Sequence, residues 1–362
     1  MFSSKLALAL VPTLLLTGCA TAPTVSATPT AATHTVCLVA DAKGLVDGGV
    51  NESAYSAIKE AVVSLGVAKI QKVLHSNSSQ SSILATVKLM VTRGCGVIVA
   101  TGERVRASVV KVARANPEVA FVLVDDAVPP ATPRPLANNL KHLMFEASQS
   151  AILAGYLAAS NSKTSLVATF GSFDTPAVRA SMQGFAAGVQ LFNNDTDADV
   201  VVLGAGGVAD EWSFLGSATN ERAAKKLTTK FFVEGADIVY PVAGAASFGA
   251  GLAAIAEPER LVIGCDRDWY MDTDSLSWRG RVLASTVKQV SRPVLDVIKS
   301  FVANGVVGDP RTNEYVGTLA NGGVSLTAER SVAFEAQFNS ARSRIISGIN
   351  SGEIPTPKGS KN

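Results

Sequence analysis

Short runs of aliphatic and β-branched residues alternate with longer amphipathic stretches along most of the chain, from Val36 to residue 264. The runs recur at intervals of about 25 to 30 residues, a spacing typical of strands joined by helices. They predict strands at residues 36–40, 69–74, 96–100, 120–124, 165–170, 200–203, 238–241 and 261–264, and helices at residues 51–65, 81–92, 104–115, 146–159, 176–192, 220–233 and 247–255. Strands that alternate with helices form parallel sheets, so the pattern predicts an α/β fold.

The predicted units fall into two groups, separated by an irregular Pro-rich stretch at residues 128–135. Two similar groups predict two doubly wound lobes, with the Pro-rich stretch as the first crossing between them. Ligands of such sheets bind beyond the carboxyl ends of the strands. The residues that follow these ends are Asp41, Thr101, Gly102, Asp125, residues 171–174, Ala243, Gly244 and Asp266.

The amino terminus has the features of an export signal. Lys5 supplies a positive charge, and residues 6–16 form an apolar run shorter than the about 20 residues that span a bilayer. The run ends in the letters LTGC, which resemble the bacterial lipobox, the motif that directs lipidation of its cysteine. We therefore predict a lipoprotein signal peptide at residues 1–18 and lipidation of Cys19. The alternative is a free or disulfide-bonded cysteine after an ordinary signal.

A flexible tether is expected to follow the lipid at residues 19–35, because small residues, Thr and Pro dominate there without periodicity. Each buried acyl methylene contributes about 0.8 kcal/mol, so two or three chains hold a protein at a membrane. We expect an exported protein, lipid-anchored to the cell membrane on its extracytoplasmic face. No later apolar run reaches about 18 residues, so the folded body is expected to be soluble.

Composition narrows the classes of function. The 362 residues include 32 Lys and Arg against 30 Asp and Glu, without a long block of one sign, so no nucleic-acid partner is expected. The three His and four Cys lie apart in the sequence, so no metal site and no cofactor are expected. The chain has neither a G-x-S-x-G elbow nor a phosphate-binding loop, so we expect no enzyme activity.

Several segments of the body resemble one known family. They are LVAD at residues 38–41, NESA at 51–54, FVLVD at 121–125, LAGYLAA at 153–159, PAVR at 176–179, GFAAGV at 184–189, GADIVY at 235–240, VIGCD at 262–266 and STVK at 285–288. In their order and spacing they resemble the basic membrane protein family of PnrA-like lipoproteins, the nucleoside-binding proteins of ABC importers. The resemblance implies the type I periplasmic-binding-protein fold, in which two hinged lobes close on a ligand. It implies a first lobe at residues 36–143 plus about 269–302, and a second at 144–268 plus about 303–350.

The same resemblance assigns roles by position. Asp266 and Lys288 match an acid and a lysine that contact ribose in the family. Asn51 and Asp125 match polar contacts to the ligand, while Asp41 and Gly244 match residues that line the cleft. The implied ligand is a purine nucleoside, and the implied partners are an ABC permease and its ATPase.

One position departs from the family pattern. The family has an aromatic residue that stacks on the base directly before the Asn at the start of the first helix, and this chain has Val50 there. A second family aromatic aligns near Ala218. Other rings that could stack on a base are Phe173, Trp212 and Phe214. The alternative function is a surface lipoprotein of the same fold whose altered pocket serves sensing or adhesion.

Some of these residues could have a structural role in place of, or in addition to, contact with a ligand. Asp41 and Asp125 could bind turn amides, as Asp often does at strand ends. Asn51 could serve as a helix N-cap in addition to contacting a ligand. Lys288 is predicted to open a helix-like stretch, where it could be a solvated side chain.

Three cysteines lie in or at the ends of predicted strands: Cys37, Cys95 and Cys265. Cysteine in such a place is often a small hydrophobic residue. The first and third strands of a doubly wound lobe are neighbours, so Cys37 and Cys95 could instead form a disulfide outside the cytoplasm.

Overall fold

The computed structural model describes residues 34–41, 44–75, 77–125, 136–206, 212–272, 274–305, 313–327 and 335–358. The predicted signal peptide, Cys19 and the Pro-rich stretch lie outside the described residues. The α/β prediction is confirmed, since the chain forms two lobes, each built on its own six-stranded and mostly parallel sheet.

The first lobe is built on a sheet in which all neighbouring strands are parallel. Its strand order is β11-β5-β4-β3-β1-β2. The strands are β1 (Thr35–Ala40), β2 (Ala68–Val73), β3 (Cys95–Thr101), β4 (Ala120–Val124), β5 (Leu140–Phe145) and β11 (Glu314–Gly317).

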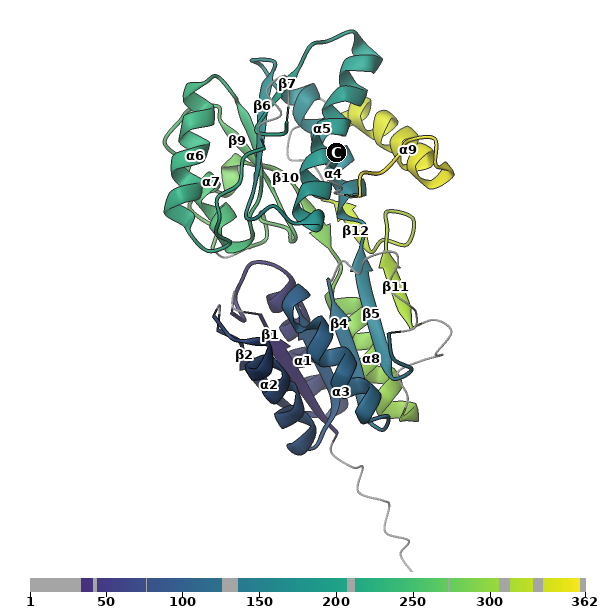
Figure 1. Ribbon diagram of the computed structural model, residues 1–362. Helices are drawn as coiled ribbons and strands as arrows, with labels where there is room; N and C mark the ends of the chain where they lie inside the picture. Colours follow the sequence, from purple (N-terminus) through teal and green to yellow (C-terminus); the bar gives the residue numbers. More distant parts are fainter. Residues whose placement is uncertain are drawn as a thin grey trace, which may run out of the picture. The chain divides into compact units, whose positions relative to one another are not determined.

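Helices cover both faces of this sheet because alternate strand residues point to opposite sides. Val36 and Leu38 of β1 pack with residues of α1 (Val50–Leu65) and α8 (Ser291–Asn304). Cys37 and Val39 pack with residues of α2 (Gln80–Thr92) and α3 (Arg106–Ala115), which follows the 3₁₀ turn η1 (Glu103–Val105). Figure 1 shows α8, drawn in green, among the purple and blue elements of this lobe although it comes late in the sequence.

The second lobe has the strand order β12-β10-β9-β8-β6-β7. Its strands are β6 (Leu166–Gly171), β7 (Val201–Leu203), β8 (Ile238–Val242), β9 (Leu261–Gly264), β10 (Val282–Lys288), which follows the 3₁₀ turn η3 (Arg279–Arg281), and the antiparallel β12 (Val324–Leu326). One face is covered by α4 (Ala147–Asn161), α5 (Pro176–Thr196) and α9 (Glu335–Ser351). The other carries α6 (Glu221–Val233), the 3₁₀ turn η2 (Gly244–Ser247) and α7 (Phe248–Ala254). No helix within the described ranges combines the length and hydropathy needed to cross a bilayer.

The chain passes between the lobes at three places: after β5, after β10 and after β11. The predicted lobe boundaries near residues 268 and 302 are wrong. Residues 282–288 form β10, which pairs with β9 of the second lobe, and residues 314–317 form β11, which pairs with β5 of the first. Sequence patterns show that a segment is a strand without showing which sheet it joins, and these two strands were not predicted at all.

Every predicted strand and helix is present, with ends shifted by a few residues. The hydrophobic pattern did not predict β5, β10, β11, β12, α8 and α9. The prediction that Lys288 opens a helix-like stretch is wrong, because Lys288 ends β10 and α8 begins at Ser291. A strand that ends at a polar residue just before a helix gives no local signal for the exact boundary.

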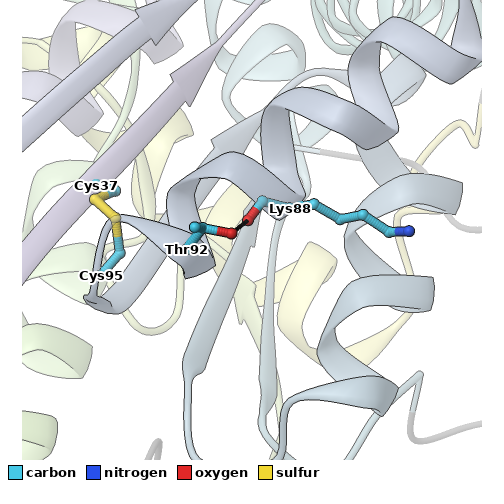
Figure 2. Close-up of a disulfide and its surroundings, with 4 residues drawn as sticks. All are labelled: Cys37, Lys88, Thr92 and Cys95. Atoms are coloured by element: carbon cyan, nitrogen blue, oxygen red, sulfur yellow. Dashed lines mark hydrogen bonds between the residues drawn. A yellow bond between two sulfur atoms is a disulfide. The ribbon is translucent and has the colours of Figure 1, made fainter.

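Cys37 and Cys95 form a disulfide, which decides between the two alternatives for this pair. Their Cα atoms are 5.8 Å apart because β1 and β3 are neighbours in the sheet. Figure 2 shows Cys95 just beyond the end of α2, where the Thr92 hydroxyl donates to the backbone carbonyl of Lys88 at 3.2 Å. Among the described residues, Cys265 remains as a buried free cysteine.

Candidate functional site

A cavity of about 210 Å³ lies between the two lobes. Its lining includes five of the six predicted site residues: Asp41, Asp125, Gly244, Asp266 and Lys288. Each lies at or just beyond the carboxyl end of a strand, which is where parallel sheets hold their ligands. The structure thus brings these five residues together, and their contact with a ligand stays a prediction.

Asn51 does not line the cavity but supports a residue that does. Its Nδ2 donates to Oδ1 of Asp41 and to the carbonyl of Gly44, both at 2.7 Å, and its Oδ1 accepts from the Thr101 hydroxyl. Asn51 is 1% exposed, so its amide is fully engaged within the protein. Asn51 therefore positions Asp41 in this structure, and its contact with a ligand stays a prediction.

The N-terminus of α1 is capped by Asp47, a residue that the sequence analysis did not single out. Its Oδ1 accepts from the amides of Gly49 at 2.9 Å and Glu52 at 3.0 Å, and its Oδ2 accepts from that of Asn51 at 3.3 Å. The interpretation of Asn51 as the N-cap is therefore wrong, since the capping carboxylate stands four residues earlier. The missed signal was an Asp followed by two glycines at a helix start.

Asp125 and Asp266 share an uncommon backbone conformation, with φ angles of 53° and 69°. Outside glycine, the left-handed region is sparsely populated, and Asp tolerates it better than most residues. Hydrogen bonds hold both turns: the Asp125 amide donates to the Leu143 carbonyl at 2.8 Å, and the Lys288 amide donates to the Asp266 carbonyl at 3.0 Å. Strained backbone of this kind concentrates at functional sites.

Lys288 holds these two carboxylates together in the lining of the cavity. Its Nζ lies 2.8 Å from Oδ2 of Asp125, in the first lobe, and 3.2 Å from Oδ1 of Asp266, in the second. Burial by itself would lower the pKa of Lys288, but the charges of Asp125 and Asp266 outweigh it and raise that pKa above its usual range. The ammonium is therefore charged at any physiological pH.

A buried polar layer lies beneath Asp266. The Tyr240 hydroxyl is 3.0 Å from that of Thr286 and 3.7 Å from the sulfur of Cys265. Burial raises the pKa of Tyr240, and burial together with the Asp266 charge raises the pKa of the Cys265 thiol. Both groups keep their protons at neutral pH, so the layer supports the site without adding charge to it.

The cavity is acidic. Its lining carries the carboxylates of Asp41, Asp47, Asp125 and Asp266 against the single ammonium of Lys288. A surplus of acceptors favours ligands that are rich in hydroxyl or amine donors and disfavours anions.

The apolar wall of the cavity is mostly aliphatic. Val50 and Ala218 both line it, so the two departures from the family pattern lie in the wall itself. Of the three candidate rings, only Phe173 is among the lining residues, and it is 47% exposed. Trp212 and Phe214 instead pack against the Arg179 guanidinium, at 4.7 and 5.4 Å from it.

A more open groove of about 490 Å³ runs along α2 and α3, where Arg104, Arg106 and Lys111 line it. It lies on one lobe and includes none of the predicted site residues. Within the described residues, no group of three or more His, Cys, Asp or Glu is placed to hold a metal ion. The cavity between the lobes is therefore the candidate site.

The chain is similar to known proteins of one family. Residues 34–358 match the family described as ABC transporter substrate-binding protein PnrA-like. The ABC transporter nucleoside-binding protein BmpA of Lactococcus lactis is 24% identical over 336 residues, which is 88% of each chain. Basic membrane protein A2 of Borrelia garinii is 29% identical over 251 residues, covering 68% of this chain and 66% of that protein. A solute-binding protein of an ABC transporter system from Aeropyrum pernix K1 shares the fold, with a TM-score of 0.67 and 21% identity over 90% of this chain and 83% of its own.

Proposed function

Because the chain belongs to the PnrA-like family of ABC transporter substrate-binding proteins, we propose that it captures a purine nucleoside between its lobes and delivers it to an ABC permease and its ATPase. The observation that carries the proposal is the Asp125–Lys288–Asp266 cluster, which joins both lobes at the cavity. A relative named as a nucleoside-binding protein matches most of this chain and supports the choice of ligand.

The cluster offers the hydrogen-bonding groups that a ribose requires. Lys288 contacts one oxygen of Asp125 and one of Asp266, which leaves the second oxygen of each carboxylate for a ligand hydroxyl. Vicinal hydroxyls donate as well as accept, so they pair with carboxylates through charge-assisted bonds about twice as strong as neutral ones. The Lys288 ammonium donates to a ribose oxygen and offsets the cost of burying the two carboxylates.

The base of the nucleoside lies against the aliphatic wall in this proposal. Val50 and Ala218 supply apolar surface without a stacking face, and Phe173 supplies a ring at the edge of the cavity. A purine therefore gains mainly from burial of its apolar area and less from stacking.

Capture proceeds through closure of the lobes, which the three connecting segments allow to move as a hinge. A ligand that touches Asp125 of one lobe and Asp266 of the other stabilises the closed form by its differential affinity for that form. The protein binds without turnover in this proposal and passes its ligand on unchanged.

Anchoring at the membrane completes the proposal. A lipid on Cys19 would tether the folded body through residues 19–35 on the extracytoplasmic face. The Cys37–Cys95 disulfide supports export, because disulfides persist in oxidising compartments outside the cytoplasm.

The test is a thermal melting series on residues 20–362 with purine and pyrimidine nucleosides, free bases, ribose and other sugars. Binding to the native state alone raises stability by about 2.7 kcal/mol at a hundred times the dissociation constant. We expect a shift with purine nucleosides that disappears in Asp266→Ala. Asp195→Ala is the matched control, because Asp195 pairs with Arg344 on the second lobe and does not line the cavity.

A second candidate function rests on the aliphatic wall at Val50 and Ala218. It is a surface lipoprotein of the same fold whose altered pocket serves sensing or adhesion. A protein that melts cooperatively, carries no co-purified ligand and shows no shift with any nucleoside would favour this second function over transport.

A further inference from the structure

An ion pair joins the two lobes outside the cavity. Glu52 lies in the first turn of α1 in the first lobe, and Arg267 follows Asp266 in the second lobe. Arg267 Nη1 lies 2.5 Å from Glu52 Oε2. Neither residue is among those that line the cavity, so this contact is separate from the ligand site.

The second lobe holds Arg267 in a fixed place. Its Nη2 pairs with Asp272, whose side chain is 4% exposed, and lies 3.6 Å from Asp274. Its guanidinium packs over the Phe248 ring, 5.3 Å from the centroid. Arg267 is thus oriented by its own lobe before the first lobe reaches it, which lowers the entropic cost of the contact.

The first lobe prepares its side of the contact in a similar way. Glu52 Oε2 also accepts from the Gly48 amide at 3.2 Å, and a carboxylate in the first turn of a helix is favoured by the helix dipole. A Cβ at Gly48 would lie 3.0 Å from Phe248 Cζ and 3.3 Å from Arg267 Nη2. The loop before α1 therefore packs closely against the second lobe at this point.

We propose that the Glu52–Arg267 pair is a latch that holds the lobes closed and sets the rate at which a bound ligand leaves. The inference rests on the proposed function, since it assumes that closure retains a ligand. The side chains are 30% and 17% exposed, so water screens the pair only in part. Arg267 follows directly after Asp266 but does not line the cavity itself, so the latch lies beside a cavity residue and outside the cavity lining.

The decisive variant is Glu52→Ala. It removes only the first-lobe partner and keeps the Arg267–Asp272 pair, whereas Arg267→Ala would also leave the Asp272 carboxylate buried without its cation. Arg344→Ala is the control, because it breaks an Arg–Asp pair that lies within the second lobe. Adenosine serves as the probe, and stopped-flow tryptophan fluorescence measures its dissociation. Trp269 suits this readout because its ring is 5.4 Å from Phe248, beneath the latch.

In Glu52→Ala we expect the dissociation rate of adenosine to rise about tenfold with little change in the association rate. Glu52→Gln, which keeps a hydrogen-bond acceptor, is expected to fall between Glu52→Ala and the wild type. Arg344→Ala should dissociate at the wild-type rate. The double variant Glu52→Ala/Arg267→Ala should dissociate no faster than Arg267→Ala, since both changes remove one interaction.

A second measurement needs no ligand. Small-angle X-ray scattering of the ligand-free protein should give a larger radius of gyration for Glu52→Ala than for the wild type and for Arg344→Ala. If adenosine does not bind the wild type, the nucleoside proposal fails and the scattering result alone decides on the latch. Unchanged scattering together with an unchanged dissociation rate in Glu52→Ala would overturn it.

Discussion

The charged and the apolar residues of the cavity lining are built on different principles. The charged part consists of Lys288 and two carboxylates from opposite lobes, and hydrogen-bonded turns fix its geometry. The apolar part includes Val50, Ala218 and one half-exposed ring, Phe173. Fixed charges favour ligand hydroxyls at particular positions, whereas an aliphatic surface gains from the burial of any apolar group. For the proposed nucleoside we therefore expect the sugar to contribute most of the affinity and the base to add less.

The largest effect is expected from Lys288→Met. The substitution leaves Asp125 and Asp266 facing each other without a cation, at a cost on the order of 3 kcal/mol, so nucleoside affinity should fall about 100-fold. Isothermal titration calorimetry measures the loss. Lys299→Met on the exposed face of α8 should bind like the wild type. Equal affinities for the wild type and Lys288→Met would contradict the central role of the cluster.

Val50→Phe should give the apolar part of the cavity lining an aromatic ring on which a base can stack. Stacking of a base on an aromatic ring contributes about 1 to 3 kcal/mol, so purine nucleosides should bind about tenfold more tightly while ribose binds as before. Titration with adenosine and with ribose measures the contribution of the base separately from that of the sugar. Val63→Phe adds the same ring on the exposed face of α1 and should change neither affinity.

Phe173→Ala should lower the affinity for nucleosides, and by less than Val50→Phe raises it. The ring is half exposed, so its removal should weaken nucleoside binding by about 1 kcal/mol, roughly fivefold, and leave ribose binding unchanged. The measurement is the same pair of titrations. A loss of ribose affinity of the same size would mean that Phe173 contacts the sugar, and would contradict its assignment to the base.

The smallest effect is expected from a change of pH, which should leave the stability contributed by Lys288 unchanged in the physiological range. Because the pKa of Lys288 is raised in the folded protein, the stability that it contributes is complete below its unfolded pKa of about 10.4 and is lost only as pH rises through the higher folded value. The difference in melting temperature between the wild type and Lys288→Met should therefore stay constant from about pH 6 to 9. A difference that shrinks across this range would mean that the lysine loses its charge there.

Much of the site was predictable because parallel sheets place the ends of their strands along one edge. Asp41 and Asp125 follow short apolar runs directly, and Asp266 follows one closely, so strand pattern alone put them near a common cleft. The hydrogen bonds of Asn51 to Asp41, Gly44 and Thr101 were not predictable, because Thr101 lies 50 residues away in the sequence. Asp47 was missed because its hydrogen bonds reach backbone amides over a turn of two glycines.

The sequence by itself determined the α/β class, the two groups of strand–helix units and the neighbouring first and third strands that allow Cys37 to pair with Cys95. These follow from local hydrophobic periodicity and from the chain order of parallel sheets. Only the tertiary structure decided that β10 joins the second sheet and β11 the first, that Lys288 bridges Asp125 and Asp266, and that Glu52 meets Arg267 across 215 positions of sequence. Such contacts depend on how the two lobes pack and on where the chain crosses between them. The local sequence around a charged residue does not indicate which distant charge it will pair with.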